Sequence, residues 1–312
     1  MSIPLLLDVD TGVDDAVALL LAASRPDVEI VAVTCCAGNV EVEQAVANTL
    51  AVLELCGLRH VEVAAGPARP LVEPLRTATS HGPRGLGYAD PPPARATASG
   101  RFAPDVLVEK ARRRPSELLL VATGPLTNVA LALRSEPALP QLLRRLVVMG
   151  GAFDHPGNTT PVAEFNVAVD PEAAHAVVAG FATAAERPLL VGLDVTDRAR
   201  LRPEHVAAVG SGPVATFVEQ ALRVKFELNG GFVRLHDPLA LALALDPSLG
   251  ASRPAAVDVE LTGSLTRAMT VVDWDGLWGR AANAEIAVEV DYERFAAEIV
   301  SRLADLDAAA AA

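Results

Sequence analysis

Cysteine, lysine and long apolar runs are all scarce in this chain of 312 residues. Only three cysteines occur, Cys35, Cys36 and Cys56, and all have apolar neighbours. This odd number favours reduced, buried thiols over a disulfide framework or a zinc site. No apolar run has the length of a membrane span, and no basic region precedes the short apolar stretch at the N-terminus. We therefore expect no membrane segment, no signal peptide and a cytoplasmic location.

Positive charge is also in short supply. The chain has 26 Lys and Arg against 39 Asp and Glu, a formal net charge of −13. Because nucleic acids attract basic surfaces, this balance argues against non-specific binding of DNA or RNA. The length allows one large domain or two small ones. Since we find neither an internal repeat nor a flexible linker, we predict a single domain over residues 1–312.

Short apolar strands alternate with helices along most of the chain. The predicted strands are Pro4–Val9, Glu29–Thr34, Val61–Ala64, Leu118–Ala122, Arg145–Met149 and Leu189–Gly192. The predicted helices among them are Asp15–Ala23, Val42–Cys56, Pro104–Arg114, one from Leu126, and Pro171–Ala179. This alternation predicts an α/β fold with a Rossmann-like, open, mostly parallel sheet and helices on both faces.

Two regions depart from the alternation. Residues 66 to about 100 are rich in Gly and Pro and are predicted to be a loop. The last part of the chain predicts a hairpin of Val257–Leu261 and Leu265–Val272 through residues 262–264, a strand at Ala284–Val290, and a helix from Tyr292 to about Leu306. We expect the antiparallel segments to extend one edge of the sheet, and Ala308–Ala312 to be a frayed tail.

Four aspartates fall within the first fifteen residues: Asp8, Asp10, Asp14 and Asp15. They stand where an apolar strand turns, at Gly12, into an apolar helix. Two unit charges about 4 Å apart repel by about 4 kcal/mol at an effective dielectric constant near 20. The helix N-terminus offsets part of this repulsion, and a hard cation bound by carboxylate oxygens would offset more. Alternatively, the last two aspartates only cap the helix, and the first two are solvated turn residues.

Other polar groups follow the carboxyl ends of separate strands, where open parallel sheets bind their ligands. These groups are Asn39, residues 123–128, and Met149–Gly151 with the loop to Asn166. His236-Asp237-Pro238 precedes a late apolar helix. Folding should gather all of them at one edge of the sheet. Each also has an ordinary explanation, since Asp237 could be an N-cap and His236 a structural histidine.

The acidic cluster and the later blocks together resemble the nucleoside hydrolases, the inosine-uridine type N-ribohydrolases. The blocks are Asp8–Asp15, Ala37–Asn39, His81-Gly82, Thr123–Asn128, Met149–Gly151, Ala163–Asn166, Asp170–Ala174, Gly192–Thr196 and His236–Pro238. They follow the order of the family from residue 4 to about residue 275. Such an ordered set is far more specific than one paired-Asp motif.

The resemblance implies an enzyme that hydrolyses the N-glycosidic bond of ribonucleosides, giving ribose and free nucleobase for purine and pyrimidine salvage. It implies a Ca²⁺ cofactor held by Asp10, Asp15, the backbone carbonyl of Thr123, and Asp237. An all-oxygen set of this kind suits calcium better than zinc. The implied catalytic residues are Asp10, which takes a proton from the attacking water, and His236, which protonates the departing base.

The resemblance also implies a pocket for a small-molecule ribonucleoside. Its implied substrate-binding residues are Asp14, Asn39, His81, Met149, Asn158, Glu164, Phe165 and Asn166. A site that pairs with ribose hydroxyls should reject deoxyribonucleosides. We also expect a homodimer or homotetramer, with no nucleic-acid or membrane partner.

Some segments depart from the family pattern. Thr11 stands where many relatives have proline. Residues 82–88 and 228–232, which are expected to lie near the base, also differ from the family pattern, so the base preference stays open. A phosphatase of the haloacid-dehalogenase type would also begin with an Asp-x-Asp pair. That class needs a suitably placed lysine, and neither Lys110 nor Lys225 has such a context.

A non-catalytic nucleoside- or calcium-binding protein of the same fold is the other alternative. It would keep Asp15 and Asp237 yet could lose the acid and the base. The presence of both Asp10 and His236 favours an enzyme.

Overall fold

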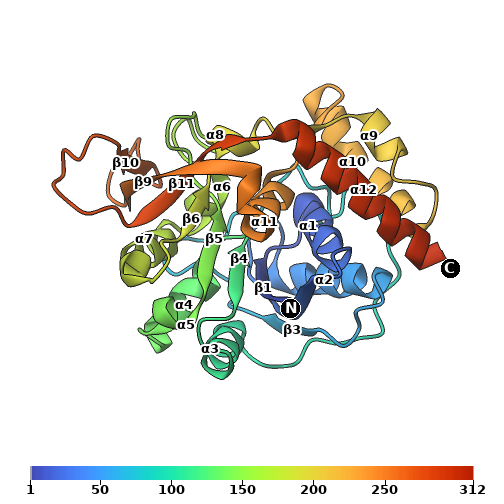
Figure 1. Cartoon of the computed structure of the whole chain (residues 1–312), viewed down its shortest axis with the longest axis horizontal. Helices are drawn as coiled ribbons and strands as arrows, with labels where there is room; N and C mark the ends of the chain where they lie inside the picture. The colour runs from blue at the N-terminus through green and yellow to red at the C-terminus, as the bar shows by residue number, and fades with distance from the viewer. Residues whose placement is uncertain (1, 312) are drawn as a thin grey trace.

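A nine-stranded sheet forms the centre of the computed structural model, which describes residues 2–311 (Figure 1). Its strands are β1 (Ile3–Val9), β2 (Val28–Cys35), β3 (Glu62–Ala65), β4 (Leu119–Ala122), β5 (Arg145–Met149), β6 (Leu189–Val191), β9 (Gly250–Val259), β10 (Thr270–Asp273) and β11 (Ala284–Val290). The strand order is β10-β9-β11-β6-β5-β4-β1-β2-β3, and the six strands from β6 to β3 are parallel. The order β3-β2-β1-β4-β5-β6 is that of a Rossmann fold, with a switch point between β1 and β4. The predicted fold class is confirmed.

Helices cover both faces of this sheet. They are α1 (Val13–Ala23), α2 (Val42–Leu55), α3 (Ala103–Arg113), α4 (Thr127–Ser135), α5 (Leu139–Leu142), α6 (Phe165–Val169), α7 (Pro171–Gly180), α8 (Leu193–Thr196), α9 (Pro203–Ala207), α10 (Pro213–Asn229), α11 (His236–Leu245) and α12 (Tyr292–Ala311). A buried apolar cluster under α1, α2, α11 and α12 lines one face, and a second under α3, α4 and α7 lines the other (Figure 1). A short ribbon of β7 (Arg200–Leu201) and β8 (Val233–Arg234) lies apart from the sheet.

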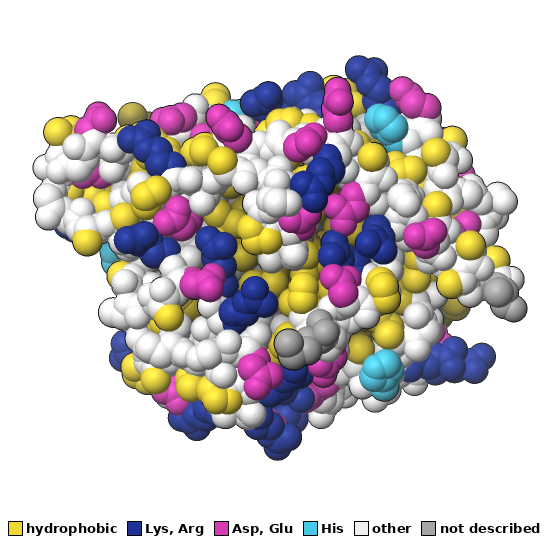
Figure 2. All heavy atoms as spheres, viewed as in Figure 1, with side chains coloured by type: hydrophobic (Ala, Val, Ile, Leu, Met, Phe, Trp, Pro, Cys, Tyr) yellow, Lys and Arg dark blue, Asp and Glu magenta, His cyan; other side chains and the backbone are white. Residues whose placement is uncertain are grey.

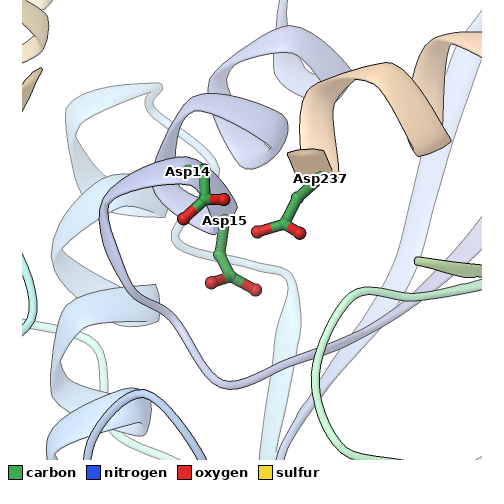
Figure 3. A group of neighbouring side chains, drawn as sticks. All are labelled: Asp14, Asp15 and Asp237. Atoms are coloured by element: carbon green, nitrogen blue, oxygen red, sulfur yellow. The ribbon is translucent and has the colours of Figure 1, made fainter. Parts of the chain in front are cut away.

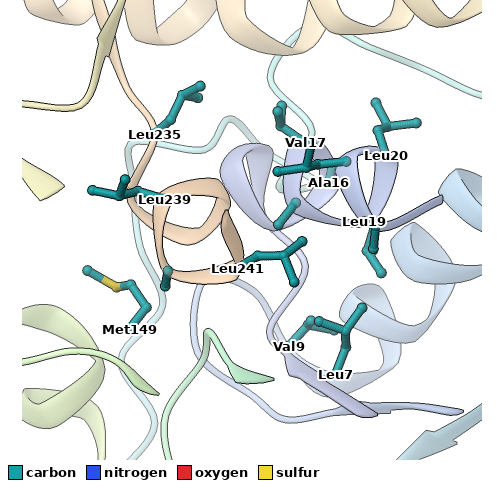
Figure 4. Close-up of a cluster of buried hydrophobic side chains, with 14 of the residues drawn as sticks. Leu7, Val9, Ala16, Val17, Leu19, Leu20, Met149, Leu235, Leu239 and Leu241 are labelled. Carbon is teal, nitrogen blue, oxygen red and sulfur yellow. The ribbon is translucent and has the colours of Figure 1, made fainter. Parts of the chain in front are cut away.

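The strand β1 shows why an unbroken apolar run is needed at the centre. Successive side chains of a strand point to opposite faces. Accordingly, Leu5 and Leu7 belong to one apolar cluster and Leu6 to the other. Figure 4 shows how α1 and α11 lie side by side on the first face, with Leu19 and Leu241 among the side chains between them and the strands. This packing brings the N-termini of the two helices together.

The C-terminal strands differ in detail from the prediction. β9 pairs antiparallel with β10 and β11, as expected, but β11 pairs parallel with β6. The predicted hairpin is wrong in its bounds, because β9 ends at Val259 and β10 begins at Thr270. Glu260 Oε1 accepts hydrogen bonds from the backbone N–H groups of Thr262 (2.6 Å) and Gly263 (3.0 Å), which turns the chain out of the strand. Leu265, read as part of a strand, is 87% exposed in this connection.

The last helix is longer than predicted, since α12 continues to Ala311 and includes residues expected to be a frayed tail. Ala312 lies outside the described residues. Asp307, buried on α12, accepts hydrogen bonds from the N–H groups of Gly212 (2.8 Å), Val214 (2.9 Å) and Ala215 (2.9 Å). These donors are the free N–H groups at the start of α10. One carboxylate therefore caps a helix from a distant part of the chain.

Acidic and basic side chains are interspersed over the face seen in Figure 2, and many form ion pairs, such as Arg25 with Glu298 (2.7 Å). Across residues 2–311, no helix combines the length and the apolar character needed to cross a membrane.

Replacing Asp307 with Ala should lower the free energy of unfolding by about 1–3 kcal/mol, because three N–H groups lose a buried, charged acceptor. Urea unfolding of the purified protein measures this loss. Asp305→Ala, an exposed aspartate on the same helix, is the matched control and should change little. Equal stabilities for the two variants would contradict the capping role.

Candidate functional site

A cavity of about 550 Å³ lies beyond the carboxyl ends of the parallel strands. Its lining includes eleven of the predicted site residues: Asp14, Asn39, His81, Thr123, Met149, Asn158, Glu164, Phe165, Asn166, His236 and Asp237. The remaining two, Asp10 and Asp15, are fully buried and are not among the lining residues. The predicted convergence of polar groups at one edge of the sheet is confirmed.

Three carboxylates meet where α1 and α11 begin. Asp14 and Asp15 lie in the first turn of α1, and Asp237 lies in the first turn of α11 (Figure 3). Each offers one oxygen, and these oxygens all lie within 4.8 Å of one another. The spacing suits a metal ion with oxygen ligands.

The helix starts differ from the prediction. α1 begins at Val13 rather than at Asp14 or Asp15, and Gly12 is its N-cap. Asp15 Oδ2 accepts a hydrogen bond from the Gly12 N–H (2.9 Å). Asp237 is not an N-cap, because Leu235 precedes α11 in that position.

Asp10 joins the cluster through Asn39, which follows β2. The Asn39 N–H donates to Asp10 Oδ2 (2.6 Å), and its Nδ2 donates to Asp10 Oδ1 (3.0 Å) and to Asp15 Oδ2 (3.2 Å). Gly38 makes this approach possible, since a Cβ there would lie 2.2 Å from Asp10 Oδ2. Asn39 was predicted to bind substrate; it lines the cavity, and its side-chain NH₂ group is engaged by these two acids.

Burial is the main reason why Asp10, Asp15 and Asp237 have raised pKa values. Burial, with the neighbouring Asp15, raises the pKa of Asp10 well above its usual value. Burial, with Asp14 and then Asp15, raises the pKa of Asp237 in the same way. Burial also raises the pKa of Asp15. The pKa of Asp14 is lowered instead: burial opposes this shift, but His81, Lys225 and His236 nearby outweigh it. The other three acids have no comparable neighbour that offsets their burial.

The reading of Asp8 and Asp10 as solvated turn residues is wrong. Asp8 is fully buried in β1, where it accepts hydrogen bonds from Thr34 Oγ1 (2.6 Å) and Asn128 Nδ2 (2.8 Å). Burial raises the pKa of Asp8 to about 7. Among the described residues, the buried Oδ1 of Asp14 has no hydrogen-bond partner. Helix capping alone would leave that oxygen unexplained.

Thr123, after β4, contacts the cluster through its hydroxyl. Its hydroxyl donates to Asp15 Oδ1 (2.8 Å), and its carbonyl accepts from Asn166 Nδ2 (2.7 Å). Asn166 Nδ2 also donates to the Met149 carbonyl (3.2 Å). The Asn166 side chain thus joins the loops after β4 and β5 and keeps its Oδ1 for a ligand.

Glu164 has a structural role beside its place in the cavity. It is the N-cap of α6, where it accepts from the N–H groups of Asn166 (2.9 Å) and Val167 (3.2 Å), and it also accepts from Gly151 (3.2 Å). Burial raises the pKa of Glu164 to about 7.

Both ring nitrogens of His81, which was predicted to bind substrate, have partners within the protein. The Val13 N–H donates to its Nδ1 (3.0 Å), and Lys225 Nζ lies 2.9 Å from its Nε2. Burial lowers the pKa of His81 to about 3, so the ring is neutral. Lys225, from α10, was not predicted to belong to the site.

His236 lines the cavity from the start of α11. Its Nδ1 lies 2.8 Å from the hydroxyl of Thr196, which leaves Nε2 to meet a ligand. Burial lowers the pKa of His236. The role of Thr196 was missed, although the matching block Gly192–Thr196 ends on it.

The fold and the cavity define an α/β enzyme with an acidic candidate metal site, open to a small polar ligand at the switch point of its sheet. The chain belongs to the family of the inosine-uridine preferring nucleoside hydrolases, whose model matches residues 5–297. This confirms the predicted resemblance and an enzyme that acts on N-glycosyl bonds of ribonucleosides.

Individual relatives match over nearly their whole length. An inosine-uridine preferring nucleoside hydrolase of Leishmania major is 37% identical, over 96% of both chains. A pyrimidine-specific ribonucleoside hydrolase RihA of Salmonella newport (strain SL254) is 39% identical, over 97% of this chain and 99% of the relative. A solved purine-preferring ribonucleoside hydrolase from Gardnerella vaginalis superposes with a TM-score of 0.91 at 30% identity, over 97% and 99% of the two chains.

Asp237→Asn should raise the melting temperature of the chelator-treated protein at neutral pH, because the amide is neutral without the proton that the buried Asp237, with its raised pKa, must take up on folding. A gain of about 1 kcal/mol corresponds to roughly 2 °C in a protein of this size. Differential scanning fluorimetry in a chelating buffer measures it, with Asp305→Asn as the exposed control. A melting temperature below that of the wild type would contradict the raised pKa of Asp237.

Proposed function

We propose that this protein is a Ca²⁺-dependent ribonucleoside hydrolase that releases ribose and a free nucleobase. The observation that carries the proposal is the group of three buried carboxylates, one with an unpartnered oxygen, two of which line a cavity of nucleoside size. Membership of the family gives the bond that is cleaved.

The residues present fit a calcium ion. Asp10, Asp15 and Asp237 would hold it together with the Thr123 carbonyl, which keeps one lone pair after accepting from Asn166. Every donor is an oxygen, as Ca²⁺ prefers. When bound, the cation supplies positive charge that keeps the acids ionised and makes a nearby water more acidic.

Asp10 would act as the general base. Both of its oxygens accept hydrogen bonds from Asn39, which fixes the direction of the carboxylate. It would take the proton of the water that attacks C1′ of the ribose. Cleavage of such a bond passes through a cation-like sugar, which the surrounding carboxylates would stabilise.

The ribose hydroxyls would bind to oxygens that the fold leaves free. Asp14 Oδ1 has no partner among the described residues, and Asn166 keeps its Oδ1. Asn158 and Glu164 line the same cavity, with Met149 and Phe165 as its less polar wall. Because hydroxyl groups satisfy these acceptors, a deoxyribonucleoside would leave one of them unpaired.

His236 would donate a proton to the departing base. Thr196 fixes the ring through Nδ1, so that Nε2 faces the ligand. A neutral nucleobase leaves more readily than its anion, and a positioned acid of this kind accelerates the step.

A panel of ribonucleosides tests the proposed activity. We expect ribose and free base in equal amounts, with water as acceptor, and at least a hundredfold preference for ribonucleosides over 2′-deoxyribonucleosides. Reducing-sugar and base assays with and without phosphate measure this. Release of ribose 1-phosphate only when phosphate is present would overturn it.

A second test separates leaving-group chemistry from sugar chemistry. His236→Ala should slow hydrolysis of natural nucleosides by about 10²–10⁴-fold. It should slow p-nitrophenyl riboside much less, because nitrophenolate leaves without a proton. Asp10→Asn is the matched comparison and should slow both substrates. Equal losses for the two substrates in the His236 variant would assign that residue to binding or folding.

A further inference from the structure

The wall of the cavity formed by α10 and β8 has no role in the chemistry described so far. It includes Lys225 and Asn229 of α10 and Arg234 of β8. If the carboxylates at the strand ends hold the ribose, the nucleobase must lie against the remaining wall. The residues of that wall can therefore select among bases.

Lys225 has a spare hydrogen-bond donor whatever its charge. Its Nζ lies 3.2 Å from Ser80 Oγ and 2.9 Å from His81 Nε2. As an ammonium group it has three N–H bonds, and these two neighbours can engage at most two of them, so at least one is left over.

An uncharged Lys225 also has one N–H bond left over. The Val13 N–H can only donate, so His81 Nδ1 accepts, and the neutral ring then carries its proton on Nε2. That N–H would donate to the lone pair of an uncharged Lys225 amine. One of the two amine N–H bonds goes to Ser80 Oγ, and one is again left for a ligand.

The neighbours of Lys225 on this wall also present donors. Asn229 Oδ1 already accepts from Arg234 Nη1 (3.1 Å), which leaves the Asn229 NH₂ group. The nearby carboxylate of Asp197 is paired with Arg234 (2.5 Å) and Arg200 (3.3 Å). This wall therefore suits a base edge that accepts hydrogen bonds.

We propose that Lys225 determines base specificity by donating its remaining N–H to an exocyclic oxygen of the base, so that oxo bases are favoured over their amino counterparts. This inference rests on the proposed function. Inosine carries an oxygen at position 6 of the purine, where adenosine carries an amino group. Uridine carries an oxygen at position 4 of the pyrimidine, where cytidine carries an amino group. An amino group facing Lys225 would leave two N–H donors opposed and unpaired, which is costly in a desolvated pocket.

The test compares kcat/KM for the two nucleoside pairs in the wild type and in Lys225→Met, which keeps the length of the side chain without its donors. We expect the wild type to prefer each oxo nucleoside by about 10- to 100-fold. The Met variant should lose at least nine-tenths of that preference, mainly through slower turnover of inosine and uridine. Lys110→Met is the matched control and should leave both ratios unchanged. Lys110 is the only other lysine; it lies on α3, where it pairs with Glu62 (2.7 Å).

Lys225→Gln keeps the test decisive if the Met variant does not fold. Its amide can donate to an oxygen or accept from an amino group, so the preference should also fall. An unchanged ratio in either folded variant, or a wild type that hydrolyses the amino nucleosides as well as the oxo ones, would overturn the inference and leave the hydrolase proposal intact. A wild type that hydrolyses none of the four would overturn the hydrolase proposal instead.

Discussion

Repulsion among buried carboxylates is the constraint on which the site depends. The packing of α1 against α11 over the centre of the sheet brings Asp14, Asp15 and Asp237 together (Figures 3 and 4). Asp10, which follows β1, is linked to Asp15 through Asn39. The free N–H groups at the two helix starts offset only part of the negative charge. A fold that keeps such a cluster favours a ligand that brings positive charge, and this is the physical basis for a cation in the proposed site.

Neutral donors from several loops hold the cluster in place. Asn39 after β2 and Thr123 after β4 donate to the acids, and Asn166 joins Thr123 to the loop after β5. On the other side, His81 accepts from the first N–H of α1 and contacts Lys225 of α10. Because α10 is itself capped by Asp307 of α12, the wall of the cavity depends on the last turns of the chain. The geometry around the ribose and the base is therefore a property of the whole sheet edge rather than of one motif.

The features that could be predicted from the sequence are those that depend on patterns of residues close together in the chain. Apolar runs such as Leu5–Leu7 identify buried strands, and the paired aspartates at the start of α1 identify the acidic site. The hairpin was misplaced because the exposed Leu265 has the same apolar character as a buried strand residue. Thr196 and Lys225 could not be singled out, because their roles arise from contacts with His236 and His81, which lie far from them in the chain. Pairings of this kind become visible only when the fold is known.

The most direct test of the account is a calcium titration of chelator-treated protein, in which bound metal and the rate of ribonucleoside hydrolysis are measured on the same samples. We expect almost no hydrolysis without metal, and recovery that is complete when one Ca²⁺ per chain is bound. Full activity in protein shown to contain no metal would contradict it.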